Sequence, residues 1–169
     1  MKKLIMTAAI LGLTATGAAA TDQDITLNAT VTSFCSLNGS TANGSVATPV
    51  SIAVAGGVPG AVTAGSNTFA VVCNASSNVS LSSLNQGLTT GGSATAPFAN
   101  KINYTATASG FAAGTLNTAS AATTGNIGVT GASATDLTVD VTAPALPSGT
   151  SYLVPGSYTD TLTVRVVPQ

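Results

Sequence analysis

Apolar and polar residues alternate with a period of two along most of the chain beyond residue 24. In residues 24–34, one side of this pattern carries Ile25, Leu27, Ala29 and Val31, and the other side carries threonine and asparagine. Such alternation is typical of a half-buried β-strand, because successive side chains point to opposite faces of a sheet. It predicts a strand that either opens its own domain or leaves that domain to pair elsewhere.

The same alternation recurs in further segments that are separated by turn residues such as Asn38-Gly39 and Pro155-Gly156. No long segment keeps apolar residues at the spacing of a helix. Six or seven strands with such turns predict an all-β sandwich. The side chains expected in its core are Val50, Ile52, Val54, Phe69, Val71, Cys73, Val79, Leu81, Ile102, Tyr104, Ala106, Ala108, Leu137, Val139, Val141, Tyr158, Leu162, Val164 and Val166.

Three features fit this pattern less well. Residues 88–96 and 110–125 are rich in Gly, Ala, Ser and Thr and poor in large apolar side chains, which predicts surface loops or weak edge strands. Asp160 departs from the apolar phase of the terminal strand, expected at residues 157–167. Its carboxylate either caps the preceding turn or faces solvent at a bulge.

The first 20 residues have the order of a secretory signal peptide. Lys2 and Lys3 precede an apolar stretch over residues 4–13, and Ala18 and Ala20 have the small-residue spacing of a cleavage site. The alternative, a membrane anchor, is disfavoured because residues 4–20 are few against the ~20 that a bilayer core requires. Cleavage after Ala20 leaves 149 residues, which fit one domain.

The composition of the exported part excludes several kinds of function. Its cations are Lys101 and Arg165, against five aspartates, so there is no basic patch to neutralise nucleic-acid phosphates. Histidine and glutamate are absent, which removes Ser/His/Asp and Cys/His catalytic sets and the usual zinc ligands. Asp136 and Asp140 are four residues apart on a predicted strand, roughly 13 Å, too far for a paired acid and base. We expect no enzyme activity, no cofactor and no metal.

Cys35 and Cys73 are the two cysteines of the chain. In an exported protein two cysteines usually form a disulfide, because the compartment is oxidising. The bridge would close a loop of about 39 residues and stabilise the fold by roughly 4 kcal/mol. Two free buried thiols are the alternative.

Three features together resemble the spore-coat-protein-U family and the related archaic, Csu-type chaperone–usher pilins. The first is the alternating segment 24–35, which reaches Cys35 soon after the signal peptide. The second is Val71-Val72-Cys73. The third is residues 154–164, which look like that family's closing G-x-Y-x-D-x-L-x-V pattern. The resemblance covers both ends of the chain, whereas residues 88–134 match in composition alone.

The resemblance implies an incomplete immunoglobulin-like sandwich that lacks its last strand, with residues 21–34 as a donor strand and residues 35–169 as the pilin domain. In that family a periplasmic chaperone fills the groove first. An outer-membrane usher then hands the subunit on, and the leading strand of the next subunit replaces the chaperone, which is a form of β-augmentation. The partners implied are other copies or other pilins, the chaperone and the usher.

The resemblance also assigns roles to named residues. Ile25, Leu27, Ala29 and Val31 would be the donor-strand side chains. Tyr158, Leu162, Val164 and Val166 would lie on the strand that bounds the groove and meets the chaperone, with the carboxylate of Gln169 anchored in the chaperone's basic cleft.

The expected function is therefore a structural subunit of a surface pilus, exported through the periplasm, that supports adhesion and biofilm formation. One alternative is a complete secreted sandwich that serves as coat or matrix material. Another is a small glycan-binding module or tip adhesin, which the scarcity of aromatic residues disfavours. An adhesin of this system also carries a second domain, for which 149 residues leave little room.

Overall fold

A computed structural model describes residues 26–39, 45–49, 54–55, 57–59 and 66–169. The proposed signal peptide, Ile25, Val50 and Ile52 lie outside the described residues. The chain divides into two compact units, residues 1–31 and residues 32–169. The described residues of the second unit form strands and turns and contain no helix. A search of the described residues finds no helix that could span a membrane.

The larger of two main sheets has the order β1-β5-β12-β9-β10, and every neighbouring pair is antiparallel. The strand β7 also pairs with β9. These strands are β1 (Cys35–Leu37), β5 (Asn67–Cys73), β7 (Leu88–Thr89), β9 (Lys101–Gly110), β10 (Gly114–Asn117) and β12 (Ser133–Ala145).

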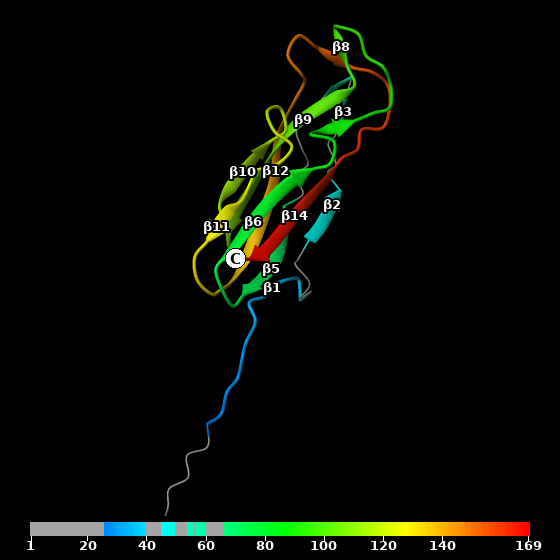
Figure 1. Ribbon diagram of the computed structural model, residues 1–169. Helices are drawn as coiled ribbons and strands as arrows, with labels where there is room; N and C mark the ends of the chain where they lie inside the picture. The colour runs from blue at the N-terminus through cyan, green and yellow to red at the C-terminus, as the bar shows by residue number, and fades with distance from the viewer. Residues whose placement is uncertain (1–25, 40–44, 50–53, 56, 60–65) are drawn as a thin grey trace, which may run out of the picture. The chain divides into compact units, whose positions relative to one another are not determined.

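The second sheet has the order β11-β6-β14-β2 and is also antiparallel throughout. Its strands are β2 (Ser45–Pro49), β6 (Ser77–Ser83), β11 (Ile127–Val129) and β14 (Thr161–Pro168). In Figure 1 this sheet lies in front of the larger one, so the residues 32–169 form two layers.

The hydrophobic core lies between these layers. In β6, β9, β12 and β14 alternate residues are buried, as the period-two pattern predicts. The fully buried side chains with the largest volumes are Tyr104, Leu37, Leu81, Leu88, Ile102, Leu116, Leu137, Leu162, Val71, Val79, Val139 and Val164. The predicted β-sandwich is therefore confirmed as the fold class.

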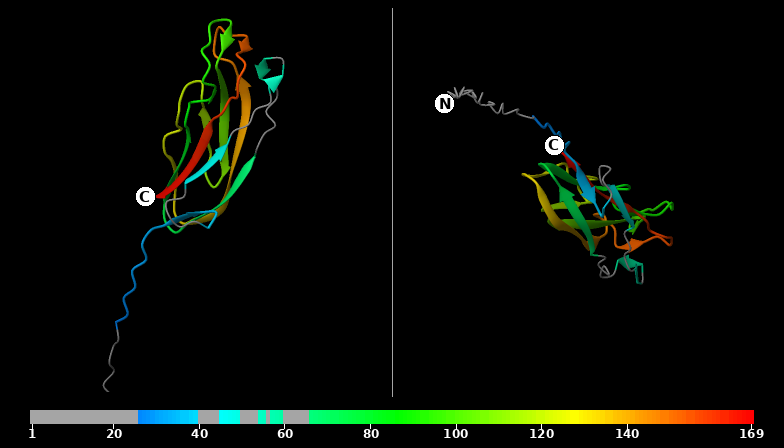
Figure 2. Two further views of the ribbon diagram at one scale, coloured as in Figure 1. Left: turned by 90° about the vertical axis from the view of Figure 1, so that its right-hand side faces the viewer. Right: turned by 90° about the horizontal axis from the view of Figure 1, so that it is seen from below.

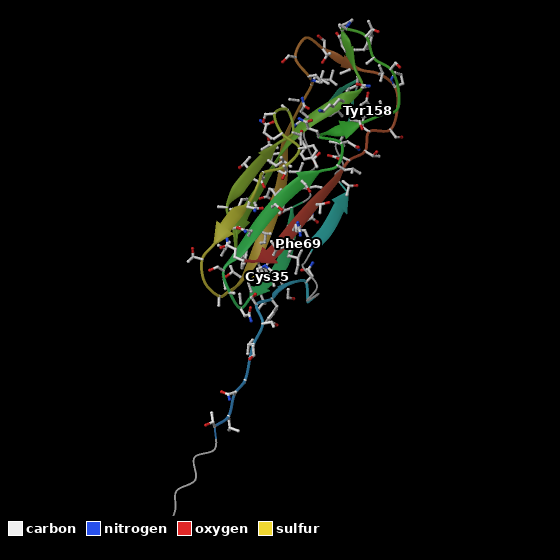
Figure 3. The ribbon with its side chains drawn as sticks, viewed as in Figure 1. Cys35, Phe69 and Tyr158 are labelled. Atoms are coloured by element: carbon white, nitrogen blue, oxygen red, sulfur yellow. A yellow bond between two sulfur atoms is a disulfide. The ribbon has the colours of Figure 1, made fainter. Side chains whose placement is uncertain are left out.

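Two short strand pairs gather at one end of the sandwich, which we call the apical end (Figures 1 and 2). They are the hairpin of β3 (Val54–Ala55) with β4 (Val58–Pro59) and the parallel pair of β8 (Phe98–Ala99) with β13 (Tyr152–Leu153). The Leu153 N–H donates to the Gly57 carbonyl at 2.7 Å and ties the two pieces together. The opposite end, where β1 begins at Cys35, is the basal end (Figure 3).

Two of the sequence-based expectations need correction, and a third is refined. Residues 26–34 form no strand within this chain, so the alternative in which they open their own domain as an ordinary first strand is wrong. The terminal strand begins at Thr161 rather than at residue 157. The segments 88–96 and 110–125 contain β7 and β10, short strands that among the described strands pair with β9 alone, as the weak-edge-strand alternative predicts. The burial of Leu88, Phe111 and Leu116 was not predicted. The many small residues in these segments masked the pattern of the few large apolar side chains that reach the core.

Turn chemistry was predicted better than the loops were. Asn38 and Gly39 both have positive φ, of 50° and 80°, as their sequence indicates. Gly110 also has positive φ, of 85°, and a Cβ atom there would collide with the Asp136 carbonyl oxygen. The sharp exit from β9 therefore requires glycine at this position.

Candidate functional site

Residues 26–31 form a leader segment with exposed side chains and no regular secondary structure. Leu27 is 89% exposed and Val31 is 79% exposed, and Ala29 is exposed as well. A strand needs neighbours for its backbone N–H and C=O groups, so the alternating pattern by itself does not make this segment a strand. The structure thus leaves an apolar row without a partner among the described residues.

Asn74 fixes the point at which the second unit begins. The Phe34 N–H donates to its side-chain Oδ1 at 2.7 Å, and its Nδ2 donates to the Thr32 carbonyl at 2.9 Å. The Asn74 N–H also donates to the Phe34 carbonyl at 3.2 Å. We call this arrangement the Asn74 clamp. It holds residues 32–34 as an extension of β1, although they lie outside the regular strand.

The predicted disulfide is present. Cys35 and Cys73 lie directly opposite each other in the β1–β5 register, with a Cα–Cα distance of 4.2 Å, and both are buried. The bond therefore ties the edge strand β1 to the larger sheet next to the clamp. A disulfide is consistent with an exported protein. The leader lies before Cys35 and hence outside the loop that the bond closes.

The strand β14 carries the residues expected at the groove. Leu162, Val164 and Val166 are buried and face the larger sheet, as their alternation predicts. Tyr158 precedes the strand and is half-buried; its hydroxyl donates to the carbonyls of Ala99 and Val154. Gln169 follows the strand, and its amide Nε2 donates to the Asn78 Oδ1 at 2.7 Å.

One side of β14 pairs with β6 along seven residues, whereas β2 pairs with the other side over five. The pairing with β2 runs from Thr161 to Arg165; beyond it, the described residues contain no partner on that side. In the register, Thr48 and Val46 stand opposite the buried Leu162 and Val164. The neighbour of this core strand is therefore short and contains a proline at one end, Pro49.

Sequence reasoning missed a buried polar network beneath the start of β14. The Asp160 carboxylate is almost fully buried, and it neither caps the Pro155-Gly156 turn nor faces solvent. Its Oδ2 accepts hydrogen bonds from the hydroxyls of Ser83, at 2.6 Å, and Tyr104, at 2.7 Å. Its Oδ1 accepts from the N–H groups of Asn85 and Thr161 at 3.0 and 2.8 Å.

This network ties β6, β9 and β14 together, with Asp160 as its common acceptor. Burial is the main cause that raises the pKa of the Tyr104 phenol above its usual value. Ser83 lowers that pKa by less, and the neighbouring Asp160 carboxylate raises it further. The phenol therefore stays protonated and remains a donor. In the sequence, the one signal of this network was that Asp160 breaks the apolar alternation. The residues that donate hydrogen bonds to Asp160 come from distant strands, so the sequence did not reveal them.

The described residues hold no cluster of three or more His, Cys, Asp or Glu side chains that could bind a metal ion. Asp136 is exposed on β12, and Asp140 is half-exposed on the same outer face.

Comparisons of this chain with models of protein families, with curated proteins and with solved structures find no match.

Proposed function

We propose that this protein is a non-enzymatic structural subunit of an exported chaperone–usher pilus, and that it polymerises by strand exchange. The leader of one copy adds as a strand beside β14 of another copy, with Ile25, Leu27, Ala29 and Val31 facing the core. A periplasmic chaperone covers this site before assembly, and an outer-membrane usher orders the exchange. The resulting fibre carries adhesion and biofilm formation at the cell surface.

The exposure of Leu27 and Val31 is the observation that carries this proposal. Large apolar side chains in a strand-patterned segment are rarely left in water unless a partner covers them, and pairing with a sheet edge supplies both backbone and side-chain contacts. The leader also precedes the disulfide and the Asn74 clamp, so it can enter another molecule while both remain intact.

The strand order supports an immunoglobulin-like assignment of the acceptor. The order β1-β5-β12-β9 matches the A-B-E-D sheet of that fold, and β6-β14 matches strands C and F. The seventh strand, G, would then lie beside β14. Among the described residues, that place is taken by β2 over five residues.

Both side-chain burial and backbone pairing are needed to hold the leader beside β14. Burying Leu27 and Val31 contributes about 1.5–3 kcal/mol each, whereas ordering the backbone costs roughly 1–2 kcal/mol per residue. Side-chain burial alone therefore does not hold the leader, and the ladder hydrogen bonds with β14 are needed.

The test uses matched substitutions on the two sides of the leader. Leu27→Asp places a charge in the proposed buried row, whereas Thr26→Asp places the same charge on the polar side. We expect ladders of oligomers that resist unheated detergent gels for the unmodified protein and for Thr26→Asp, and their loss for Leu27→Asp. Equal ladders for both variants, or monomers for all three proteins, would overturn the proposal.

A complete secreted sandwich without strand exchange is the second candidate, because β2 already pairs with β14 in this structure. This candidate predicts a monomer whose stability is unaffected by removing residues 22–31. Under the pilin proposal, the same removal abolishes the ladders. Comparing the two proteins on unheated gels and in urea unfolding separates the candidates.

A further inference from the structure

The second unit carries exposed apolar side chains at both of its ends. At the apical end, Phe98 is 47% exposed and Tyr152 is 49% exposed, and their ring centroids lie 6.0 Å apart. Val58 is exposed on the hairpin that is tied to Leu153. We call Val58, Phe98 and Tyr152 the apical cluster. Aromatic rings are scarce in this chain and enriched in protein interfaces, so their exposure side by side favours a contact site.

At the basal end, Phe34 and Val72 are exposed beside the disulfide. In the register Ser36 pairs with Val72, and Asn74 lies opposite Phe34, so Phe34 and Val72 share one face as diagonal neighbours. We call these two residues the basal pair. The Asn74 clamp holds Phe34 in this position.

We propose that the apical cluster of one copy packs against the basal pair of the next copy in the fibre. This inference rests on the proposed strand exchange and identifies a second contact, outside the exchanged strand, that the exchange brings together. The partner that the apical cluster contacts is a second copy of this chain. The direction of β14 and the short connection between leader and domain determine that the apical end of one copy meets the basal end of the next.

The direction of the added strand follows from β14. This strand starts close to the apical end, since Tyr158 just before it bonds to Ala99 of β8, and it ends at the basal end, where Pro168 is paired with Ser77. A leader that pairs antiparallel to β14, as β2 does, runs from the basal to the apical end of the acceptor. Its last residue, Val31, therefore emerges among the apical loops.

The link between that strand and the donor's own domain is short. Val31 and Phe34 are three positions apart, with two residues between them, and this stretch spans about 10 Å at full extension. The Asn74 clamp binds Thr32 and Phe34 to the donor. The basal end of the donor must then lie against the apical loops of the acceptor. The contact is heterologous and repeats along the fibre, so each copy uses both of its patches.

Photocrosslinking tests this contact in the full-length, disulfide-bonded protein. Phe98 is replaced by p-benzoylphenylalanine, which keeps an aromatic ring at a half-exposed position, and Thr115 on the exposed edge of β10 is the control site. We expect crosslinks from position 98 to peptides of a second copy that contain Phe34 or Val72. Their yield should be roughly 1,000-fold above that of the control, since linked sites meet at millimolar effective concentration and free copies at micromolar.

The outcomes separate this inference from the function on which it rests. Suppose that heat-sensitive ladders form. If position 98 then crosslinks to other regions, or crosslinks no more than position 115 does, the proposed contact is overturned and strand exchange still stands. Monomers without ladders would overturn both. As an independent measurement, Phe98→Asp should reduce the yield of long ladders, and Val72→Lys in the same chain should restore it, whereas Val72→Asp should not. Equal yields for these three variants contradict the contact.

Discussion

Replacing Asp160 with alanine tests whether the buried network, rather than the hydrophobic core alone, holds β14 in register. The substitution removes the acceptor of four hydrogen bonds, two from the hydroxyls of Ser83 and Tyr104 and two from backbone N–H groups. Both hydroxyl-bearing residues are buried, so water does not replace the lost carboxylate freely. β14 is the strand to which the exchanged leader would pair.

The loss in free energy of unfolding follows from these four contacts. Leaving the partners of a buried charged group unsatisfied costs about 3–5 kcal/mol, a large fraction of the 5–15 kcal/mol that is typical for a domain. Tyr104→Phe removes one charge-assisted bond and should cost about 1.5–3 kcal/mol. The double variant has no Tyr104 hydroxyl left without an acceptor. Its loss in free energy of unfolding should therefore be smaller than the sum of the two single-variant losses by about 1–2 kcal/mol.

The assay is urea unfolding of the disulfide-bonded protein, followed by circular dichroism, for the two single variants and the double variant. Tyr158→Phe is the matched control, since the Tyr158 hydroxyl donates to two neutral carbonyls and should be worth about 0.5–1.5 kcal/mol. Additive costs for Asp160→Ala and Tyr104→Phe, or a loss below about 1 kcal/mol for Asp160→Ala, would refute the reasoning.

Three further predictions follow from the same structure. Because burial raises the pKa of Tyr104 in the folded state, the unfolded chain loses its phenol proton first, and the free energy of unfolding should fall as pH rises above about 10; urea midpoints should show this slope, and Tyr104→Phe should reduce it. Reducing the Cys35–Cys73 bond should lower the free energy of unfolding by roughly 4 kcal/mol, seen as a shift of the urea midpoint with dithiothreitol; an unchanged midpoint contradicts a structural role. Asn74→Ala should raise the amide hydrogen-exchange rate of Phe34 about tenfold, the equivalent of one hydrogen bond, and an unchanged rate contradicts the clamp.

The local pattern predicted the parts of the fold that depend on near neighbours in sequence. The alternations at residues 69–73, 102–108 and 137–141 each bury the face that was expected, and Asn38-Gly39 turns where its chemistry indicates. The disulfide was also predictable, since the chain has two cysteines and two cysteines behind a predicted signal peptide usually pair.

The leader shows where such prediction ends. Its alternation is as regular as that of β9, yet residues 26–34 form no strand. A period of two specifies which side chains would share a face, but a strand also requires a neighbour with free backbone groups. Whether such a neighbour is present depends on the surroundings of the segment and not on its own sequence.

The sequence by itself determined the class of the protein: an all-β chain with one disulfide, alternating core strands and none of the residues for His-based catalysis. The tertiary structure decided which strands are neighbours, that β2 covers part of β14, and that Asp160 is buried. The physical reason is that periodicity and turn chemistry act over a few residues. By contrast, the donors that satisfy Asp160 from Ser83 and Tyr104 stand 77 and 56 residues away, and they meet only when the two sheets pack.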